Sequence, residues 1–362
     1  MKLTRSQVFY LTFMNYPILN IGILPLMIRV AGKDLWISTL LSSTIGLLIA
    51  LLLWDLEKKN PEQTCLDMLK TRPGGHIIIW VLVPILILYL WLLCVLASVS
   101  LTEFISIGFI QETPFWVIAL IFGLCIAYSL RKGMTSLADL AGVLTLSTIL
   151  SGTTMSIAIS GKRHVSYFLP IGEHGIYPIL LGVVLFVPIW TELFFLGFMP
   201  RDFVKGKGWI KTYFWIVLIN TIIFVGHSEG PITAFGLGQA KNFNFPELSA
   251  VKVISLGFID RFDVYGLLLM LYGSFIRVSF YSQLSLSLIC RMFPSTKIRI
   301  SPMTSTILPI IFLITGTIWL FRNTAFFHGL LQPFIRISLS MFALFLVIYL
   351  FIRFTKPHQV FE

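Results

Sequence analysis

Two charged side chains lie deep inside apolar stretches of this sequence. Arg277 stands at the centre of the apolar segment 264–290, and Glu192 stands inside the segment 177–199. About 20 Å of helix separates Arg277 from either end of its segment, too far for the guanidinium to reach water by snorkelling. A charge at the centre of a bilayer is unfavourable by at least about 2.5 kcal/mol. We therefore predict that both side chains face protein or water, and that they pair with each other.

Two interpretations of this pair stay open. Ionisable residues inside a membrane usually mark a ligand site or an ion pathway, but an ion pair can also simply lock two helices together. Ser274 and Tyr281 fall on the same helix face as Arg277 at spacings of three and four residues. This polar stripe favours the first interpretation. Ser274, Arg277 and Tyr281 are therefore candidate ligand-binding residues, as is Glu192.

Further candidates come from two points where helices should be interrupted. Gly22 tolerates non-helical angles and Pro25 lacks an N–H, which predicts a break at residues 20–24 or, alternatively, a simple proline kink. A second interruption is predicted from Pro188 to Glu192. Free backbone N–H groups at such breaks bind ligands, so a ligand carboxylate is expected near Gly22. The candidate ligand-binding residues of the two segments are Asn20, Ile21, Gly22, Ile23, Leu24, Trp190, Thr191 and Glu192.

Other polar residues give weaker indications. Ser98 and Thr102 could line the same cavity, although Ser and Thr also commonly bridge membrane helices. Asp139 is expected to cap the start of a helix. Catalytic motifs, metal-ligand spacings and nucleotide-binding loops are missing from the sequence, so we expect neither enzyme activity nor a metal or cofactor. The net charge of +11 is not gathered into basic clusters interleaved with aromatics, so nucleic acid is not an expected partner.

The elements that must position these residues are transmembrane helices. Of the 362 residues, 57% are hydrophobic and only 12% are charged, against roughly 25% charged in soluble domains. A chain this apolar needs the lipid bilayer as its solvent, and each crossing takes about 20 apolar residues. We predict an all-α integral membrane protein forming a single domain over residues 1–362. About ten spans are expected, at 7–30, 35–54, 77–108, 114–130, 137–160, 177–199, 209–226, 264–290, 305–321 and 337–353.

Charge distribution predicts how these spans are oriented. With the N-terminus inside, 17 Lys and Arg residues fall in cytoplasmic segments and 9 in outer ones, with Arg277 alone inside a span. Both termini are therefore expected inside. The loop 227–263 is expected outside, with a short amphipathic helix at 248–259 over the outer mouth. Spans 1 and 6, the two broken helices, hold corresponding positions in a five-plus-five inverted repeat.

Several short stretches, in this order along nearly the whole chain, resemble one known family. They are Gly22-Ile-Leu, Glu112-Thr113-Pro114, Arg131-Lys-Gly133, Glu192-Leu-Phe-Phe and Phe258-Ile-Asp260-Arg261-Phe-Asp263, together with the basic residue Arg277 in span 8. The chain resembles the B subunit of the spore germination receptors, the endospore germination permeases of the amino acid–polyamine–organocation transporter superfamily. It departs from the family pattern at Thr135 and Asp139, where an acidic and then a basic residue are usual.

The resemblance implies a sensor. Such a subunit would bind a small germinant, commonly an amino acid, beside an A membrane subunit and a C lipoprotein in the inner membrane of the spore. Binding would trigger germination, with release of ions and dipicolinate. The alternative is an amino-acid permease that carries its substrate across the membrane. The two functions use the same fold and site, so the sequence does not separate them.

Overall fold

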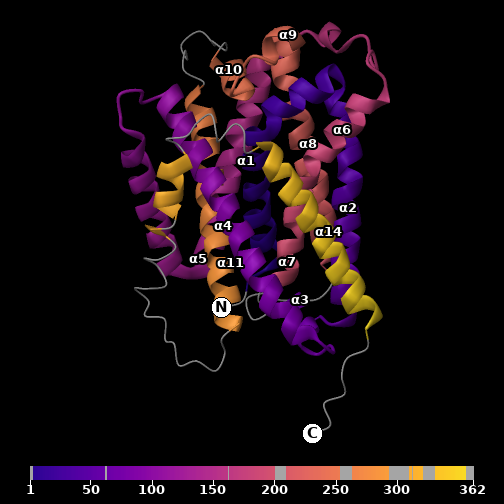
Figure 1. Ribbon diagram of the computed structural model, residues 1–362. Coiled ribbons are helices and arrows are strands. Elements are labelled where there is room, and N and C mark those ends of the chain that lie inside the picture. The colour runs from indigo at the N-terminus through magenta and orange to yellow at the C-terminus, as the bar shows by residue number, and fades with distance from the viewer. Residues whose placement is uncertain are drawn as a thin grey trace.

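The chain folds into one bundle of long helices that stand side by side (Figure 1). The computed structural model describes residues 3–61, 63–161, 163–199, 209–252, 263–292, 310–311, 313–320 and 331–355. Within these residues, seven helical stretches are long and apolar enough to cross a membrane. The prediction of an all-α, multi-pass membrane protein is confirmed.

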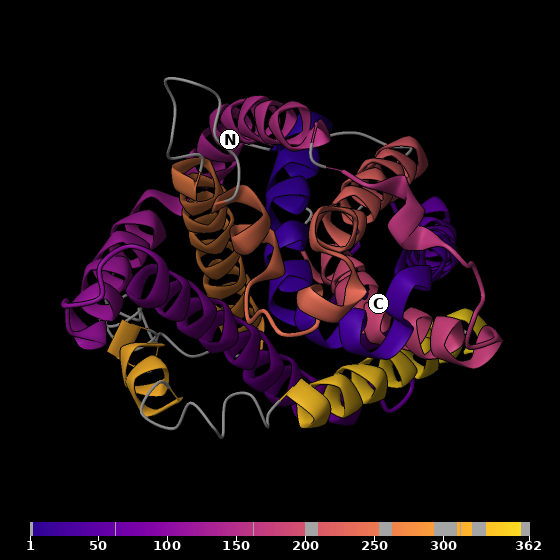
Figure 2. The same ribbon diagram turned by 90° about the horizontal axis from the view of Figure 1, so that it is seen from above.

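Helix α1 (Arg5–Ala31) runs through the middle of the bundle, as the view from above shows (Figure 2). A capping box starts it, in which the Gln7 backbone N–H donates to Thr4 Oγ1 at 3.3 Å and the Thr4 N–H donates to Gln7 Oε1 at 2.7 Å. Gly32 ends it with a positive φ of 60°. Contacts with α5, α6, α8 and α11 surround it on all sides.

The predicted break of this helix at residues 20–24 is wrong, because α1 is helical throughout. Proline in a helix removes one backbone hydrogen bond and crowds the carbonyl four residues earlier, at a cost of about 3 kcal/mol. Around Pro25 that loss is offset by buried apolar neighbours: Ile23, Leu24 and Met27 are each at most 1% exposed. Tertiary packing overrides the local helix-breaking tendency.

The next helices follow α1 in chain order. After η1 (Gly32–Asp34) and α2 (Leu35–Lys59) come the short α3 (Cys65–Lys70) and the long α4 (Gly75–Gly108). Helix α5 (Phe115–Ser160) is divided at Gly133, whose φ of 83° only glycine adopts readily. Its two arms correspond to the predicted spans 114–130 and 137–160.

The interruption predicted from Pro188 to Glu192 is found only at its last residue, because the helix that holds Pro188 continues to Thr191. Helix α6 (Ile176–Thr191) tightens into the 3-10 turn η3 (Glu192–Phe194) before the single turn α7 (Phe195–Phe198). At the junction the Glu192 backbone N–H bonds the Ile189 carbonyl three residues back, as a 3-10 turn requires. A 3-10 helix η2 (Val165–Phe168) precedes α6.

The segment after α7 corrects a second prediction. Residues 227–235 were expected in an outer loop, but α8 (Ile210–Phe235) continues through Pro231 to a cap at Gly236. Helices α9 (Leu237–Ala240) and α10 (Pro246–Lys252) then lie over the end of the bundle (Figure 1). The outer helix predicted at 248–259 is thus present to residue 252, and its second half lies outside the described residues.

Helix α11 (Asp263–Met292) crosses the bundle beside α1 and α4, and α14 (Leu331–Phe354) packs against α6. Residues 310–311 and 313–320 are also helical, but most of the other residues of predicted span 305–321 fall outside the described part. The count of ten spans and the five-plus-five repeat therefore stay predictions.

Candidate functional site

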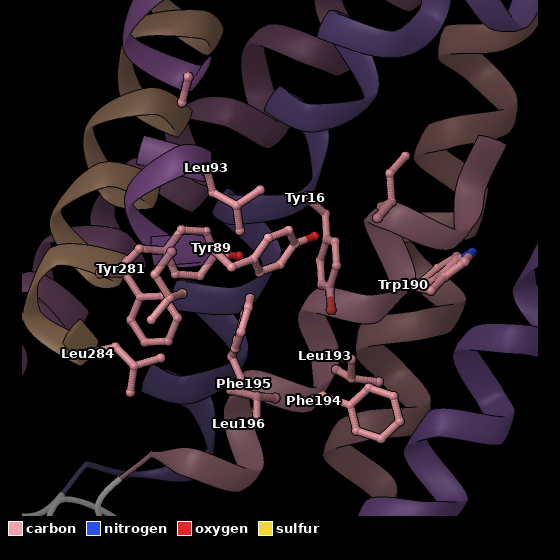
Figure 3. Packing of buried hydrophobic residues seen from close by; sticks show 14 of the residues in the cluster. Tyr16, Tyr89, Leu93, Trp190, Leu193, Phe194, Phe195, Leu196, Tyr281 and Leu284 are labelled. Atoms are coloured by element: carbon pink, nitrogen blue, oxygen red, sulfur yellow. The ribbon is translucent and has the colours of Figure 1, made fainter. Parts of the chain in front are cut away.

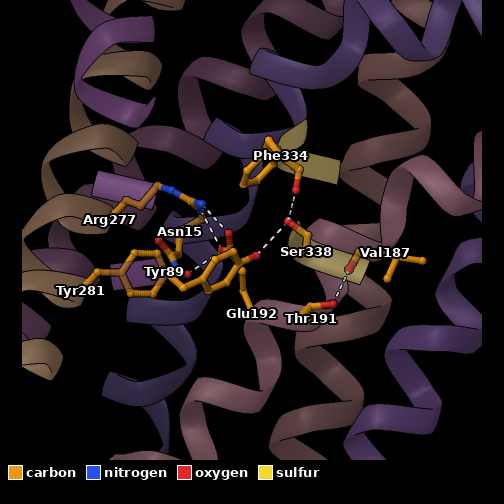
Figure 4. Close-up of polar contacts among 9 residues, drawn as sticks. All are labelled: Asn15, Tyr89, Val187, Thr191, Glu192, Arg277, Tyr281, Phe334 and Ser338. Carbon is orange, nitrogen blue, oxygen red and sulfur yellow. Dashed lines mark hydrogen bonds and ion pairs between the residues drawn. The ribbon is translucent and has the colours of Figure 1, made fainter. Parts of the chain in front are cut away.

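Arg277 and Glu192 meet in the interior of the bundle, as predicted (Figure 4). Helix α11 carries Arg277 at its centre, and Glu192 is the first residue of η3. Arg277 Nη1 donates to Glu192 Oε2 at 2.8 Å, and Nη2 donates to Oε1. Each side chain is only 1% exposed. The contact is a bidentate guanidinium–carboxylate ion pair, a geometry that gives strong hydrogen bonds in proteins.

Helix α1 is tied to the same pair. Arg277 Nη1 also donates to the Asn15 backbone carbonyl at 2.9 Å. The Tyr281 hydroxyl donates to Glu192 Oε2 and accepts a hydrogen bond of 2.6 Å from Asn15 Nδ2. We call Asn15, Glu192, Arg277 and Tyr281 the ion-pair cluster. It joins α1, η3 and α11 at one point.

The electrostatics of the cluster are balanced within the protein. An ion taken out of water loses several kcal/mol of solvation, which is recovered only if geometry is good and the remaining donors and acceptors are bonded. Here each carboxylate oxygen of Glu192 accepts at least one hydrogen bond, and the positive charge of Arg277 is also above the Tyr281 ring, 5.1 Å from its centre. The cluster is therefore neutral overall, and both of its charges are paired within the protein.

Three buried polar atoms beside the cluster have no hydrogen-bond partner within the described residues. They are Asn15 Oδ1, Tyr16 Oη and Ser274 Oγ. Tyr16 follows Asn15 on α1, and Ser274 lies one helical turn before Arg277 on α11. Buried polar atoms in proteins nearly always have a partner. These atoms are therefore the places where a small polar ligand could form hydrogen bonds.

Aromatic rings pack on Tyr281 of the cluster and on its neighbour Tyr16 (Figure 3). The Tyr16 ring packs on Trp190, with 5.9 Å between ring centroids, and the Phe195 ring meets Tyr281 edge-on at 5.5 Å. Tyr89 of α4 lies against Phe195 at 6.0 Å. These rings exclude water from the ion pair, which strengthens its electrostatic interaction.

Some candidate residues make their hydrogen bonds within their own helix. The hydroxyls of Ser98, Thr102 and Thr191 each donate to the carbonyl four residues earlier, at 2.8, 2.7 and 2.7 Å respectively. Trp190 Nε1 donates to Ser42 Oγ of α2 at 3.1 Å. In this structure these four residues contribute packing around the cluster rather than free polar groups. Their role in ligand binding stays a prediction.

The candidates on α1 are helical and do not offer free backbone groups. Ile23 and Leu24 are buried, and a Cβ on Gly22 would lie 3.8 Å from Ser100 Oγ of α4. The side chains of Asn20 and Ile21 lie outside the described residues. Ligand binding at these five positions is therefore neither supported nor tested by contacts.

Sequence reasoning missed Asn15, Tyr16, Tyr89 and Ser338. Tyr89 Oη donates to Ser338 Oγ of α14 at 2.9 Å, which links α4 to α14 close to the cluster (Figure 4). None of these residues is charged, so none stands out in an apolar segment. A usable signal was the pairing of a polar and an amphipathic residue, Asn15-Tyr16, in the middle of the first span.

Asp139 has a partner in another helix. It accepts a hydrogen bond of 2.6 Å from Gln7 Nε2, which ties the start of α1 to the second arm of α5. The described part of the chain holds no group of three or more His, Cys, Asp or Glu side chains that could bind a metal ion.

Comparisons with known proteins identify the family of this chain. The family model described as spore germination protein matches residues 2–319. Spore germination protein XB of Bacillus anthracis is 26% identical over 72% of this chain and 73% of its own length. Spore germination protein KB of Bacillus subtilis (strain 168) is 26% identical over 69% of this chain and 68% of its own. Spore germination protein YndE of the same organism is 25% identical over 78% and 79%. The chain, a multi-pass membrane protein with a buried ion-pair cluster at its centre, belongs to the spore germination protein family.

Proposed function

We propose that this chain is the permease-like subunit of a spore germination receptor and that it senses a small nutrient, an amino acid, to trigger germination. The observation that carries the proposal is the ion-pair cluster, which joins α1, η3 and α11 through two fully buried charges. A charged pair of this kind is costly in hydrocarbon, and such residues mark functional sites in membrane proteins. The family assignment supports the same function.

The cluster gives the sensor a mechanism. A ligand shifts a conformational equilibrium only if it binds one conformer better than the other. In the structure described here the Arg277–Glu192 pair ties three helical elements together, and this defines the resting conformer. A germinant that binds better where these contacts are broken would favour a second arrangement of α1 and α11, which the rest of the receptor would detect.

The receptor partners belong to the same proposal. Membership of a spore germination family implies further receptor subunits, and we propose an A membrane subunit and a C lipoprotein in the inner membrane of the spore. The whole chain, 1–362, would act as one transmembrane domain. Co-purification of the three subunits from solubilised spore membranes tests this assembly, and recovery of this chain without them would contradict it.

The orientation has its own test. Both termini are proposed on the core side, with α9 and α10 on the outer side. Asn242 is exposed in the turn between these two helices. In a chain whose native cysteines are replaced, Asn242→Cys should react with an impermeant thiol reagent in intact vegetative cells. Labelling only after lysis would reverse the assigned orientation.

The function itself is tested with spores that lack this chain. A panel of amino acids, sugars and potassium salts should include a nutrient to which wild-type spores respond and the deletion strain does not, measured by dipicolinate release. Equal responses of the two strains to every nutrient would refute the sensor. Uptake of a radiolabelled amino acid by the purified chain in liposomes would favour the permease alternative.

A further inference from the structure

We infer that the Arg277–Glu192 pair stands in for the ligand's own charges, so that the ligand is a zwitterion whose carboxylate takes over Arg277 and whose ammonium takes over Glu192. This inference rests on the proposed function and extends it to the way the ligand opens the site. In this inference, Arg277 and Glu192 select the ligand by its charges.

The burial of the pair is the first step. Both side chains are 1% exposed, so neither charge can exchange its partner for water. Separating them without replacement would leave two unpaired charges in an apolar interior, which is strongly unfavourable. The pair can open at low cost only if each partner receives a new opposite charge at the same time.

The sign of the ligand's charges follows. A lone anion could replace Glu192 at Arg277 but would leave the carboxylate unpaired. A lone cation would leave Arg277 unpaired, and an uncharged molecule would leave both. A zwitterion leaves no charge unpaired, because the one internal pair is exchanged for two pairs with the ligand and the site stays neutral.

The unpartnered atoms beside the pair fit the two ends of such a molecule. An ammonium has three N–H donors, so one remaining donor could meet Asn15 Oδ1 after Glu192 is engaged. A carboxylate accepts several hydrogen bonds, and the hydroxyls of Tyr16 and Ser274 are donors with no acceptor among the described residues. Both kinds of group that the ligand needs are therefore already buried next to the pair.

The exchange also provides the coupling to conformation. Arg277 Nη1 holds both Glu192 and the Asn15 carbonyl, and the Tyr281 hydroxyl joins Glu192 to the Asn15 side chain. Turning the guanidinium and the carboxylate toward a ligand removes the bonds that tie α1 to η3 and α11. The ligand therefore binds in the same step in which the contacts of the resting conformer break.

The first experiment uses the unmodified receptor in spores. The half-maximal concentration for germination is measured for the standard L-amino acids, D-glucose and potassium chloride. Each active amino acid is then compared with its amide, its decarboxylated amine and its deaminated 2-hydroxy acid. Each singly charged analogue should be weaker by about ten- to a hundredfold, the value of a hydrogen bond to a charged group. Analogues as potent as the amino acid would overturn the inference.

The second experiment assigns the two ends. Glu192→Gln removes the internal partner of Arg277, so that Arg277 can pair with an anionic ligand. The potency of the 2-hydroxy acid relative to the amino acid should therefore rise by about tenfold or more. Arg277→Met should shift the ranking toward the amine. Glu173→Gln, which alters an exposed ion pair, is the matched control and should leave the ranking unchanged. An unchanged ranking in both cluster variants, at normal abundance, would overturn the inference.

A third variant covers the case in which the charge-changing variants do not accumulate. Tyr281→Phe keeps both charges and removes one hydrogen bond to Glu192, so the pair opens more easily. The half-maximal amino-acid concentration should fall by about several-fold, and an unchanged or higher value would count against the exchange. A response that depends on this chain but only to glucose or potassium chloride would refute the zwitterion and leave the sensor intact. No chain-dependent response at all would refute the sensor itself.

Discussion

Two ion pairs in this molecule use the same chemistry in opposite surroundings. Arg277 and Glu192 are each 1% exposed, whereas Lys33 and Glu173, joined at 3.0 Å between Nζ and Oε2 at one end of the bundle, are 25% and 46% exposed. Water can take over either partner of the second pair and neither partner of the first. The comparison teaches that an ion pair constrains the fold strongly only where solvent cannot replace it.

A third pair falls between these extremes. Arg291, near the end of α11, donates to Asp67 Oδ2 at 3.1 Å, and the two side chains are 21% and 36% exposed. Asp67 also belongs to the capping box that starts α3, with Thr64 as its partner. Helix α11 thus carries one buried and one half-exposed arginine, so a single helix allows both environments to be tested.

The largest effect should come from separating the buried pair. Arg277→Met or Glu192→Gln alone leaves an unpaired buried charge and should destabilise the chain by about 3–5 kcal/mol, whereas the double variant should recover part of this loss. Thermal unfolding of the four forms in detergent gives the double-mutant cycle. Simple additivity of the two single effects would show that the residues do not act as a pair.

The second effect concerns Glu247 at the start of α10. Burial raises the pKa of its carboxyl from 4.5 to about 8, and both carboxylate oxygens lack a hydrogen-bond partner within the described residues. A titratable neighbour is His227 of α8, with Nδ1 at 3.7 Å from Glu247 Oε1. The folded chain therefore keeps a proton that the unfolded chain releases near pH 4.5.

Because the folded-state pKa is raised, this group favours the folded chain fully below pH 4.5, and its contribution declines as the pH rises toward 8. Wild-type chain should lose stability between these values, by at most about 1.4 kcal/mol for each pH unit that separates the two pKa values. Glu247→Gln should flatten this dependence when unfolding temperature is measured against pH. An unchanged slope in the variant would rule out Glu247 as its source.

The third effect, smaller, concerns Asp67. Burial alone would raise the pKa of this carboxyl, but hydrogen bonds from Thr64 and the charge of Arg291 outweigh it, and the pKa lies below the ordinary value of 3.8. Its stabilising contribution is therefore present above pH 3.8 and is lost as the pH falls through the lowered pKa. Asp67→Asn should cost about 1 kcal/mol at neutral pH, as the loss of a helix cap does, in the same unfolding assay. If Asp67→Asn destabilised the chain as much as Arg277→Met, burial would not explain the difference in strength between the half-exposed and the buried ion pair.

The smallest effect should be that of Glu173→Gln. Lys33 lowers the pKa of the Glu173 carboxyl, but the group is open to solvent, which can replace its partner. We expect no measurable change in unfolding temperature or in germination. A loss comparable to that of Asp67→Asn would mean that the contact between Lys33 and residues 169–173 constrains the fold more than its exposure indicates.

The accuracy of sequence reasoning differed between charged and proline-containing segments. Arg277 and Glu192 were paired correctly because the cost of an unpaired charge in hydrocarbon leaves few alternatives. Pro25 and Pro231 were each expected near a helix break or beyond a helix end, yet α1 and α8 continue past them. The lost hydrogen bond and the steric clash of an interior proline cost about 3 kcal/mol, which packing against neighbouring helices can offset.

By itself, the sequence determined that this chain is an integral membrane protein with long, apolar helices. It also determined that Arg277 and Glu192 must pair. These conclusions follow from composition and from the solvation energy of single groups, which need no knowledge of neighbours. Only the tertiary structure decided that the Asn15 carbonyl and the Tyr281 hydroxyl complete the cluster. It also decided that the hydroxyls of Tyr16 and Ser274 find no hydrogen-bond partner within the described part of the chain. Which neutral groups meet in an interior depends on the packing of helices far apart in sequence, and no local pattern encodes it.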